Sequence, residues 1–147
     1  MKGSYEVVER SEQEIGGNED LLTIIDIDRC ILNSQYFFEL VTAALRTLGV
    51  TDATLDQVIR DEADNRGNAF DYIAEIRRQE PQALLSVETL VNFLLEAHDH
   101  RELAHRIFAP GAIVLVRTTK STKSHALFLT AGGVDTQRVK LGVINKL

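Results

Sequence analysis

The chain is poor in cysteine, proline and aromatic residues, and it contains no tryptophan. Its 147 residues include one cysteine, Cys30, and two prolines. A lone cysteine cannot form an internal disulfide, and no CxxC or Cys/His pattern offers a structural zinc site. No apolar run approaches the roughly 18 residues that a bilayer span requires, and the first residues lack the apolar core of a secretory signal. We therefore expect a cytoplasmic protein with no membrane helix and no membrane partner.

An excess of positive charge is also missing. Sixteen Lys and Arg residues stand against 22 Asp and Glu residues, which gives a formal net charge of −6. Neutralising the phosphates of a nucleic acid requires clustered basic residues, so we expect no nucleic-acid partner. The charge is uneven, because residues 108–147 alone carry a net charge of +5. Contacts to an anion are expected there, although a solvated basic face explains the same count.

Apolar residues make up 44% of the chain, which is enough for a buried core. Residues 1–20 lack periodicity and predict a polar N-terminal extension. Two short and continuous apolar runs, residues 21–27 and 126–130, are typical of strands that are buried on both faces of a parallel sheet. Between them, residues 35–107 repeat apolar side chains at helical spacing. This segment predicts a small helical bundle.

Polar and small residues follow both predicted strands. The first strand ends in Asp26-Ile27-Asp28, and the second ends in Thr130-Ala131-Gly132 just before a predicted helix. A hydroxyl and a glycine between a strand and a helix allow backbone N–H groups to hold a phosphate. Both motifs also have a purely structural interpretation. Asp-x-Asp at a strand end occurs in solvated turns and helix caps, and Thr130 fits a turn equally well.

Taken together, the two strand ends resemble the haloacid dehalogenase-like hydrolases. Residues 24–34 are similar to the first signature of that family, a strand that runs into Asp-x-Asp, and residues 127–133 are similar to the second. The resemblance implies an α/β fold, with a partial Rossmann-like parallel sheet formed by residues 21–34 and 108–147. Residues 35–107 would be an inserted α-helical cap. On the same basis we expect residues 111–122 to be helical, against the β propensity of residues 112–116.

The resemblance also implies a chemistry and the residues that perform it. Asp26 would be the nucleophile that forms an aspartyl-phosphate, and Asp28 would be the general acid and base. A Mg²⁺ ion would be held by the Asp26 carboxylate and the Asp28 backbone carbonyl. Thr130, with the N–H groups of Ala131 and Gly132, would bind the transferring phosphoryl oxygens. The implied substrate is a small phosphorylated metabolite, hydrolysed as a phosphate monoester.

The chain departs from the family pattern in two places. Arg29 and Cys30 stand where the family usually has Gly and Thr. After Leu141 only six residues remain, so the third signature with its Lys and the fourth with its acidic residues are missing. Lys140 and Lys146 come too early in the sequence to be assigned to that Lys. We therefore expect a chain that is truncated after the second signature, or a degenerate relative.

Two functions follow as alternatives. The first is a Mg²⁺-dependent phosphatase of the haloacid dehalogenase-like class, which the missing signatures could leave inactive. The second is a non-catalytic helical interaction module in which the Asp pair is a relic. Two parallel strands by themselves would leave edges and an apolar face uncovered, so we expect the chain either to be poorly stable or to self-associate. The shared site requires that residues 21–27 and 126–130 pair in parallel, with Asp26 beside Thr130.

Overall fold

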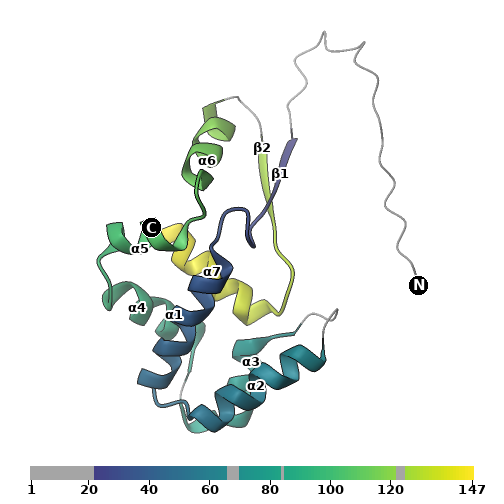
Figure 1. The fold of residues 1–147 in the computed structure, drawn as a ribbon, viewed down its shortest axis with the longest axis vertical. Helices are drawn as coiled ribbons and strands as arrows, with labels where there is room; N and C mark the ends of the chain where they lie inside the picture. The colour runs from purple at the N-terminus through teal and green to yellow at the C-terminus, as the bar shows by residue number, and fades with distance from the viewer. Residues whose placement is uncertain (1–21, 66–69, 84, 122–124) are drawn as a thin grey trace, which may run out of the picture.

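The computed structural model describes residues 22–65, 70–83, 85–121 and 125–147 (Figure 1). The polar extension predicted over residues 1–20 lies outside them. The elements are, in chain order, β1 Leu22–Asp26, α1 Ser34–Thr47, α2 Asp52–Asp64, α3 Tyr72–Gln79, the 3-10 helix η1 Pro81–Ala83, α4 Val87–Glu96, α5 His100–Ile107, α6 Ala112–Ser121, β2 His125–Leu129 and α7 Val134–Lys146. In this part of the chain no helix combines the length and the apolar character needed to cross a membrane.

The prediction of a partial Rossmann-like α/β core is wrong. The described residues form seven α-helices and a single sheet of two strands. In a Rossmann-like unit the helix after a strand packs back onto the sheet. Here α7 leaves β2 and packs against α4 and α3 instead, and α6 is the helix that contacts the sheet. Figure 1 shows the sheet and α6 at one end of the molecule and the other helices at the opposite end.

The two strands pair in parallel, which confirms that prediction. Ile24 lies opposite Leu127, and Asp26 lies opposite Leu129. One face of this sheet is partly covered: Ile25 is buried in a small cluster that includes Ala112 of α6, whereas Phe128, which pairs with Ile25, is 43% exposed. On the other face Ile24, Leu127 and Leu129 are 56%, 46% and 50% exposed. The sheet therefore has one partly covered face and one open apolar face.

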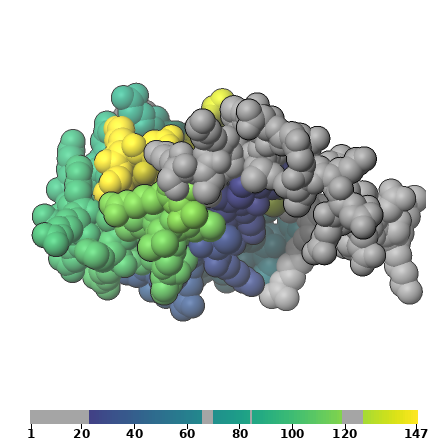
Figure 2. Space-filling view, turned by 90° about the horizontal axis from the view of Figure 1, so that it is seen from above, coloured from purple at the N-terminus to yellow at the C-terminus, as the bar shows by residue number. Residues whose placement is uncertain are grey.

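Helix α6 forms as expected from the resemblance, although its first five residues, Ala-Ile-Val-Leu-Val, are rich in β-branched side chains. Ala112 is buried at its start, and the outward side chains of Ile113 and Val114 are 42% and 67% exposed. Figure 2 shows α6 in green at the surface of the molecule, beside the C-terminal end of α7 in yellow. Ala112 and Val116 of α6 pack in the small cluster with Ile25, so the helix forms there against its local β propensity.

The main hydrophobic core lies among the other helices. Its most deeply buried members come from six of them: Leu45, Leu55, Val58, Ile73, Ile76, Leu90, Leu94, Leu103, Ile107, Val139 and Val143. Helices α4 and α7 approach closely, because a Cβ atom on Gly142 would lie 2.8 Å from Cγ2 of Val91. The helical segment 35–107 and α7 therefore share one core, and this contact sets the position of Lys140 on α7.

Asp71 joins the N-termini of two helices. Its carboxylate accepts hydrogen bonds from N–H of Ala74 in α3 (3.1 Å) and from N–H of Asp135 (2.7 Å) and Thr136 (3.2 Å) in α7. Burial opposes ionisation of this carboxyl, but the hydrogen bonds outweigh burial and lower the pKa of Asp71. Gly133 leaves room for the arrangement, since a Cβ atom there would lie 2.0 Å from Cβ of Asp71. The start of α7 is thereby fixed to α3.

Candidate functional site

Asp26 and Asp28 lie at the carboxyl end of β1 and have different surroundings. Asp26 is the last residue of the strand, and its side chain is exposed. It has no hydrogen-bond or ion-pair partner in the described part of the chain. Asp28 is half-buried in the loop that leads to α1. Two carboxylates thus follow one strand end, and among the described residues only the Asp28 carboxylate has a partner.

The Asp28 carboxylate is held from two sides. Lys140 Nζ on α7 donates to Oδ1 and Oδ2 at 2.8 and 2.9 Å, and Ser34 Oγ at the start of α1 donates to Oδ1 at 2.8 Å. The Lys140 side chain is only 13% exposed. From the sequence, Lys140 is not assigned to the Lys of the missing third signature, but the structure brings its ammonium group to Asp28.

Arg29 turns the loop at this point. Its φ of 64° lies in the left-handed region that favours glycine. Its N–H donates to the Leu32 carbonyl (3.0 Å) and to Ser34 Oγ (3.2 Å), which closes the loop around Asp28. A glycine at this position would adopt this φ without strain. Cys30, next in the loop, is an exposed free thiol.

The predicted phosphate-binding residues follow β2. Thr130 Oγ1 donates to Oε1 of Gln137, and Gln137 Nε2 donates to the Ala131 carbonyl (2.7 Å). The N–H groups of Ala131 and Gly132 form no hydrogen bond within the described residues, so they are available to an anion. The N–H groups of Asp135 and Thr136, in contrast, are occupied by the Asp71 carboxylate.

The two strand ends meet with an offset of one residue. Asp26 pairs with Leu129, and N–H of Ile27 donates to the Leu129 carbonyl (2.9 Å). Thr130 therefore comes one position beyond Asp26, and successive side chains along extended backbone point to opposite faces. The backbones of the two motifs are adjacent as predicted, but the Thr130 hydroxyl is directed to Gln137 and not to Asp26.

A cleft of about 1170 Å³ opens beside the two carboxylates. It follows α1 from the Asp26 end of the molecule toward α2 and α3. Its charged lining residues are Asp26, Asp28, Arg29, Glu39, Glu62 and Lys140, and its larger apolar lining residues are Phe37, Phe38, Val41, Tyr72, Ile73 and Val139. Thr130, Ala131 and Gly132 do not line it. The structure therefore joins the Asp pair and Lys140 to a cleft, with the second strand end outside its lining.

The fit of a metal ion depends on the oxygen atoms at the end of β1. Among the residues that the structure describes, no group of three or more His, Cys, Asp or Glu side chains is arranged to hold a metal. The Asp28 carboxylate is already paired with Lys140, which leaves the Asp26 carboxylate and the Asp28 backbone carbonyl. Mg²⁺ commonly keeps several waters and takes one or two carboxylates. These atoms fit a weakly held and largely hydrated Mg²⁺.

Comparison with protein-family models, with curated proteins and with solved structures finds no match to this chain.

Proposed function

We propose that the chain hydrolyses small phosphate monoesters through Asp26. The observation that supports this proposal is the contrast between the two carboxylates at the end of β1. Asp26 is exposed and without a partner, as a nucleophile requires, whereas Asp28 is fixed by Lys140 and Ser34. Both line the same cleft. A free carboxylate beside an oriented one is an arrangement suited to nucleophilic attack followed by proton transfer.

The reaction would proceed in two steps. In the first, the Lys140 ammonium turns from Asp28 to the phosphoryl oxygens, which allows Asp28 to carry a proton. An Asp26 oxygen then attacks phosphorus, the bond from phosphorus to the alcohol oxygen breaks, and Asp28 gives its proton to the leaving alcohol. In the second, a water molecule attacks the phosphorus of the aspartyl-phosphate, and the Asp28 carboxylate accepts the proton of that water. Inorganic phosphate leaves, and the Asp26 carboxylate is restored.

Several groups would stabilise the charge of the phosphoryl oxygens. The Lys140 ammonium lies at Asp28, and the N–H groups of Ala131 and Gly132 are unpaired among the described residues. Thr130 would have to turn its hydroxyl from Gln137 to join them. Asp26 and the Asp28 carbonyl would hold Mg²⁺, which supplies positive charge when it is bound. The exposed free thiol of Cys30 suits a reducing compartment such as the cytoplasm.

The experiment is hydrolysis of a phosphate monoester in millimolar Mg²⁺ by the wild-type chain and four variants. Asp26→Asn should eliminate turnover, because an amide cannot form the aspartyl-phosphate. Asp28→Asn should be nearly as damaging, and Thr130→Ala should cost about 10- to 1000-fold. Cys30→Ser is the matched control in the same loop and should retain activity. Loss of activity in Cys30→Ser together with an active Asp26→Asn would replace the carboxylate mechanism by a thiol mechanism.

A second candidate function is self-association through the open face of the sheet. Ile24, Leu127 and Leu129 are about half exposed there, and contiguous exposed apolar surface is typical of interaction sites. The partner would be a second copy of the chain. Sedimentation at increasing concentration should show dimers that Leu127→Glu abolishes, with Val114→Glu on α6 as the control. A monomer at every concentration would rule this function out.

A further inference from the structure

The cleft extends well beyond the atoms that the proposed reaction needs. Asp26 and Asp28 stand at one end, and the cleft continues along α1 past Phe37 and Phe38 to Val41. Ser34 and Val41 are seven residues apart, which corresponds to roughly 10 Å along an α-helix. This length exceeds a phosphoryl group and matches a molecule with one ring. The cleft therefore has room for the alcohol part of a substrate.

The walls of this extension are mainly apolar and partly aromatic. Phe38 is half-buried, and its ring meets the ring of Tyr72 edge to face, with centroids 5.0 Å apart. Ile73 of α3 and Val139 of α7 line the cleft as well. Small-molecule sites are typically lined in this way, with a few polar groups that set the orientation. In this cleft Asp26, Asp28 and Lys140 are the polar groups at the end where the phosphoryl group would bind, and the carboxylates of Glu39 and Glu62 also line it.

The charges along the extension disfavour a second anionic group. Glu39 of α1 and Glu62 of α2 are exposed carboxylates on its lining. The lining cations, Arg29 and Lys140, belong to the loop and helix at the Asp28 end. An alcohol that carries a carboxylate would therefore meet charges of its own sign at the far end of the cleft.

We propose that the cleft selects the leaving alcohol, and that the substrates are phosphate monoesters of apolar, ring-containing alcohols without a carboxylate. The proposal rests on the proposed hydrolysis at Asp26 and adds the substrate class to it. The ring lies against Phe38 in this arrangement, and the phosphoryl group lies at Asp26. Phe38 and Glu39 are then specificity-determining residues that take no part in bond making or breaking.

The first test measures kcat/KM for phenyl phosphate and for ethyl phosphate, which lacks the ring. Phe38→Ala should lower the ratio of the two values about tenfold relative to the wild type, because the ring loses its aromatic wall. Phe93→Ala is the matched control, since Phe93 is also partly buried against the main core but lies outside the lining of the cleft. A ratio that is unchanged in Phe38→Ala, or lowered equally in Phe93→Ala, overturns the proposal and leaves the hydrolysis itself in place.

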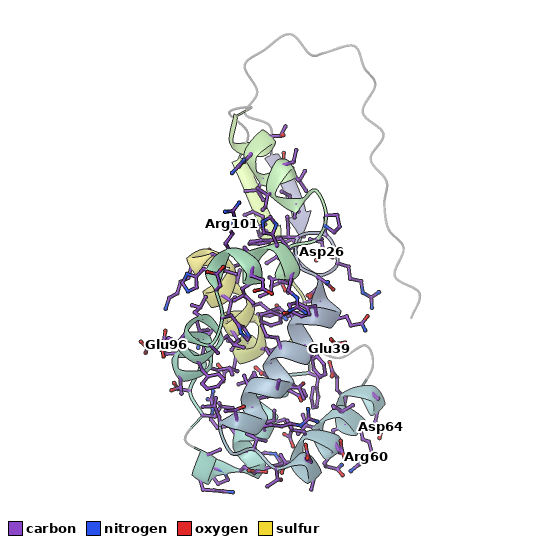
Figure 3. All side chains as sticks on the ribbon, turned by 60° about the vertical axis from the view of Figure 1, so that its left-hand side comes forward. Asp26, Glu39, Arg60, Asp64, Glu96 and Arg101 are labelled. Atoms are coloured by element: carbon purple, nitrogen blue, oxygen red, sulfur yellow. The ribbon has the colours of Figure 1, made fainter. Side chains whose placement is uncertain are left out.

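The second test compares phenyl phosphate with 4-carboxyphenyl phosphate. Glu39→Lys should raise kcat/KM for the carboxylate ester about tenfold relative to phenyl phosphate. Glu96→Lys is the charge-matched control, because Glu96 and Glu39 lie on opposite sides of the molecule (Figure 3). Equal responses in the two variants contradict a selective role of Glu39.

A binding measurement separates failure of this inference from failure of the proposed hydrolysis. If the wild type hydrolyses none of the esters, the proposed function is wrong, and calorimetry with phenylphosphonate and ethylphosphonate decides the role of the cleft. Tighter binding of phenylphosphonate that Phe38→Ala abolishes, and that Phe93→Ala preserves, supports the cleft as a site for a ring-containing anion. Equal binding of the two phosphonates, or no binding of either, overturns it.

Discussion

The helical region and the sheet region of this molecule both carry large apolar side chains, but these side chains are buried to very different degrees. Leu45 and Leu55 in the helical core are completely buried, whereas Ile24 and Leu127 in the sheet are 56% and 46% exposed. A helix buries its apolar stripe against several neighbours, but a two-stranded sheet with one covering helix has an open face. An apolar run in the sequence therefore predicts a helix or a strand, but it does not predict how deeply that helix or strand is buried.

The candidate site lies at the boundary between these regions. Asp26 ends a strand of the sparsely packed sheet, and Asp28 is fixed to the helical region by Lys140. The position of Lys140 depends in turn on the contact between α7 and α4. Substitutions in each region should therefore change the free energy of unfolding by different amounts, and substitutions at the contacts of α7 should affect the position of Lys140.

The largest effect is expected from a truncation in the helical core. Leu45→Ala should lower the free energy of unfolding by about 2 to 5 kcal/mol, because it leaves a cavity where no solvent reaches. Leu127→Ala, the same change on the open face of the sheet, should alter it by no more than about 0.5 kcal/mol. Urea denaturation followed by circular dichroism measures both. Equal losses would contradict the difference between the two regions.

A smaller loss is expected where α7 meets α4. Gly142→Ala should cost about 1 to 3 kcal/mol, because the added Cβ atom would lie 2.8 Å from Val91 Cγ2. Val91→Ala removes that methyl group and should rescue part of the loss in the double variant. A double-mutant cycle measures the coupling. Strictly additive effects would show that the two helices do not make this contact.

The junction at Asp71 should make stability depend on pH. Asp71→Ala should cost about 1 to 2 kcal/mol at neutral pH, since it removes the shared cap of α3 and α7. The pKa of Asp71 is lowered from 3.8 in the folded state, so its contribution is present above about pH 4 and is lost as the pH falls through the lower folded-state value. The difference in unfolding free energy between wild type and Asp71→Asn should shrink over that acidic window.

Asp99→Ala is the control for this junction. Asp99 caps α5 alone, through one hydrogen bond to N–H of Glu102 (2.9 Å). Its replacement should therefore cost less than that of Asp71. A larger cost for Asp99→Ala would contradict the role of Asp71 as a shared cap.

The smallest expected effect is a gain in stability in the loop between the two regions. Arg29→Gly should stabilise the fold by about 1 kcal/mol, because glycine adopts the φ of 64° without strain. Cys30→Gly is the neighbouring control and should not stabilise, since Cys30 does not have a positive φ. Thermal unfolding measures both. A destabilised Arg29→Gly would show that the Arg29 side chain contributes more than its backbone strain costs.

Features set by short segments could be predicted from the sequence, and features set by long-range packing could not. The parallel pairing of the two strands and the helical state of α6 are confirmed. The Rossmann-like core is wrong, because the apolar side chains of α7, Val139 and Val143, fit the helical core as well as they would fit a sheet. The sequence carried no information on which of these surfaces α7 would cover.

The same limit applies to the candidate site. Asp26 and Asp28 could be found because they follow a recognisable strand. Lys140 could not be assigned, because its distance from Asp28 depends on the packing of α7 and not on separation along the chain. The sequence predicts that the Thr130 hydroxyl binds a phosphate. In the structure it donates to Gln137 instead, because the first turn of the following helix brings Gln137 close. Residues on separate elements thus became a site only through the tertiary structure.

The most direct test of the account is the mass of the protein after reaction with p-nitrophenyl phosphate in Mg²⁺. This ester has a good leaving group, so Asp28→Asn should still form the aspartyl-phosphate while its hydrolysis by water is slowed. We expect Asp28→Asn to gain the mass of one phosphoryl group, located on Asp26 by peptide mapping, and the double variant Asp26→Asn with Asp28→Asn to gain none. A phosphoryl group on another residue, or hydrolysis by Asp26→Asn at the wild-type rate, would contradict the central role of Asp26.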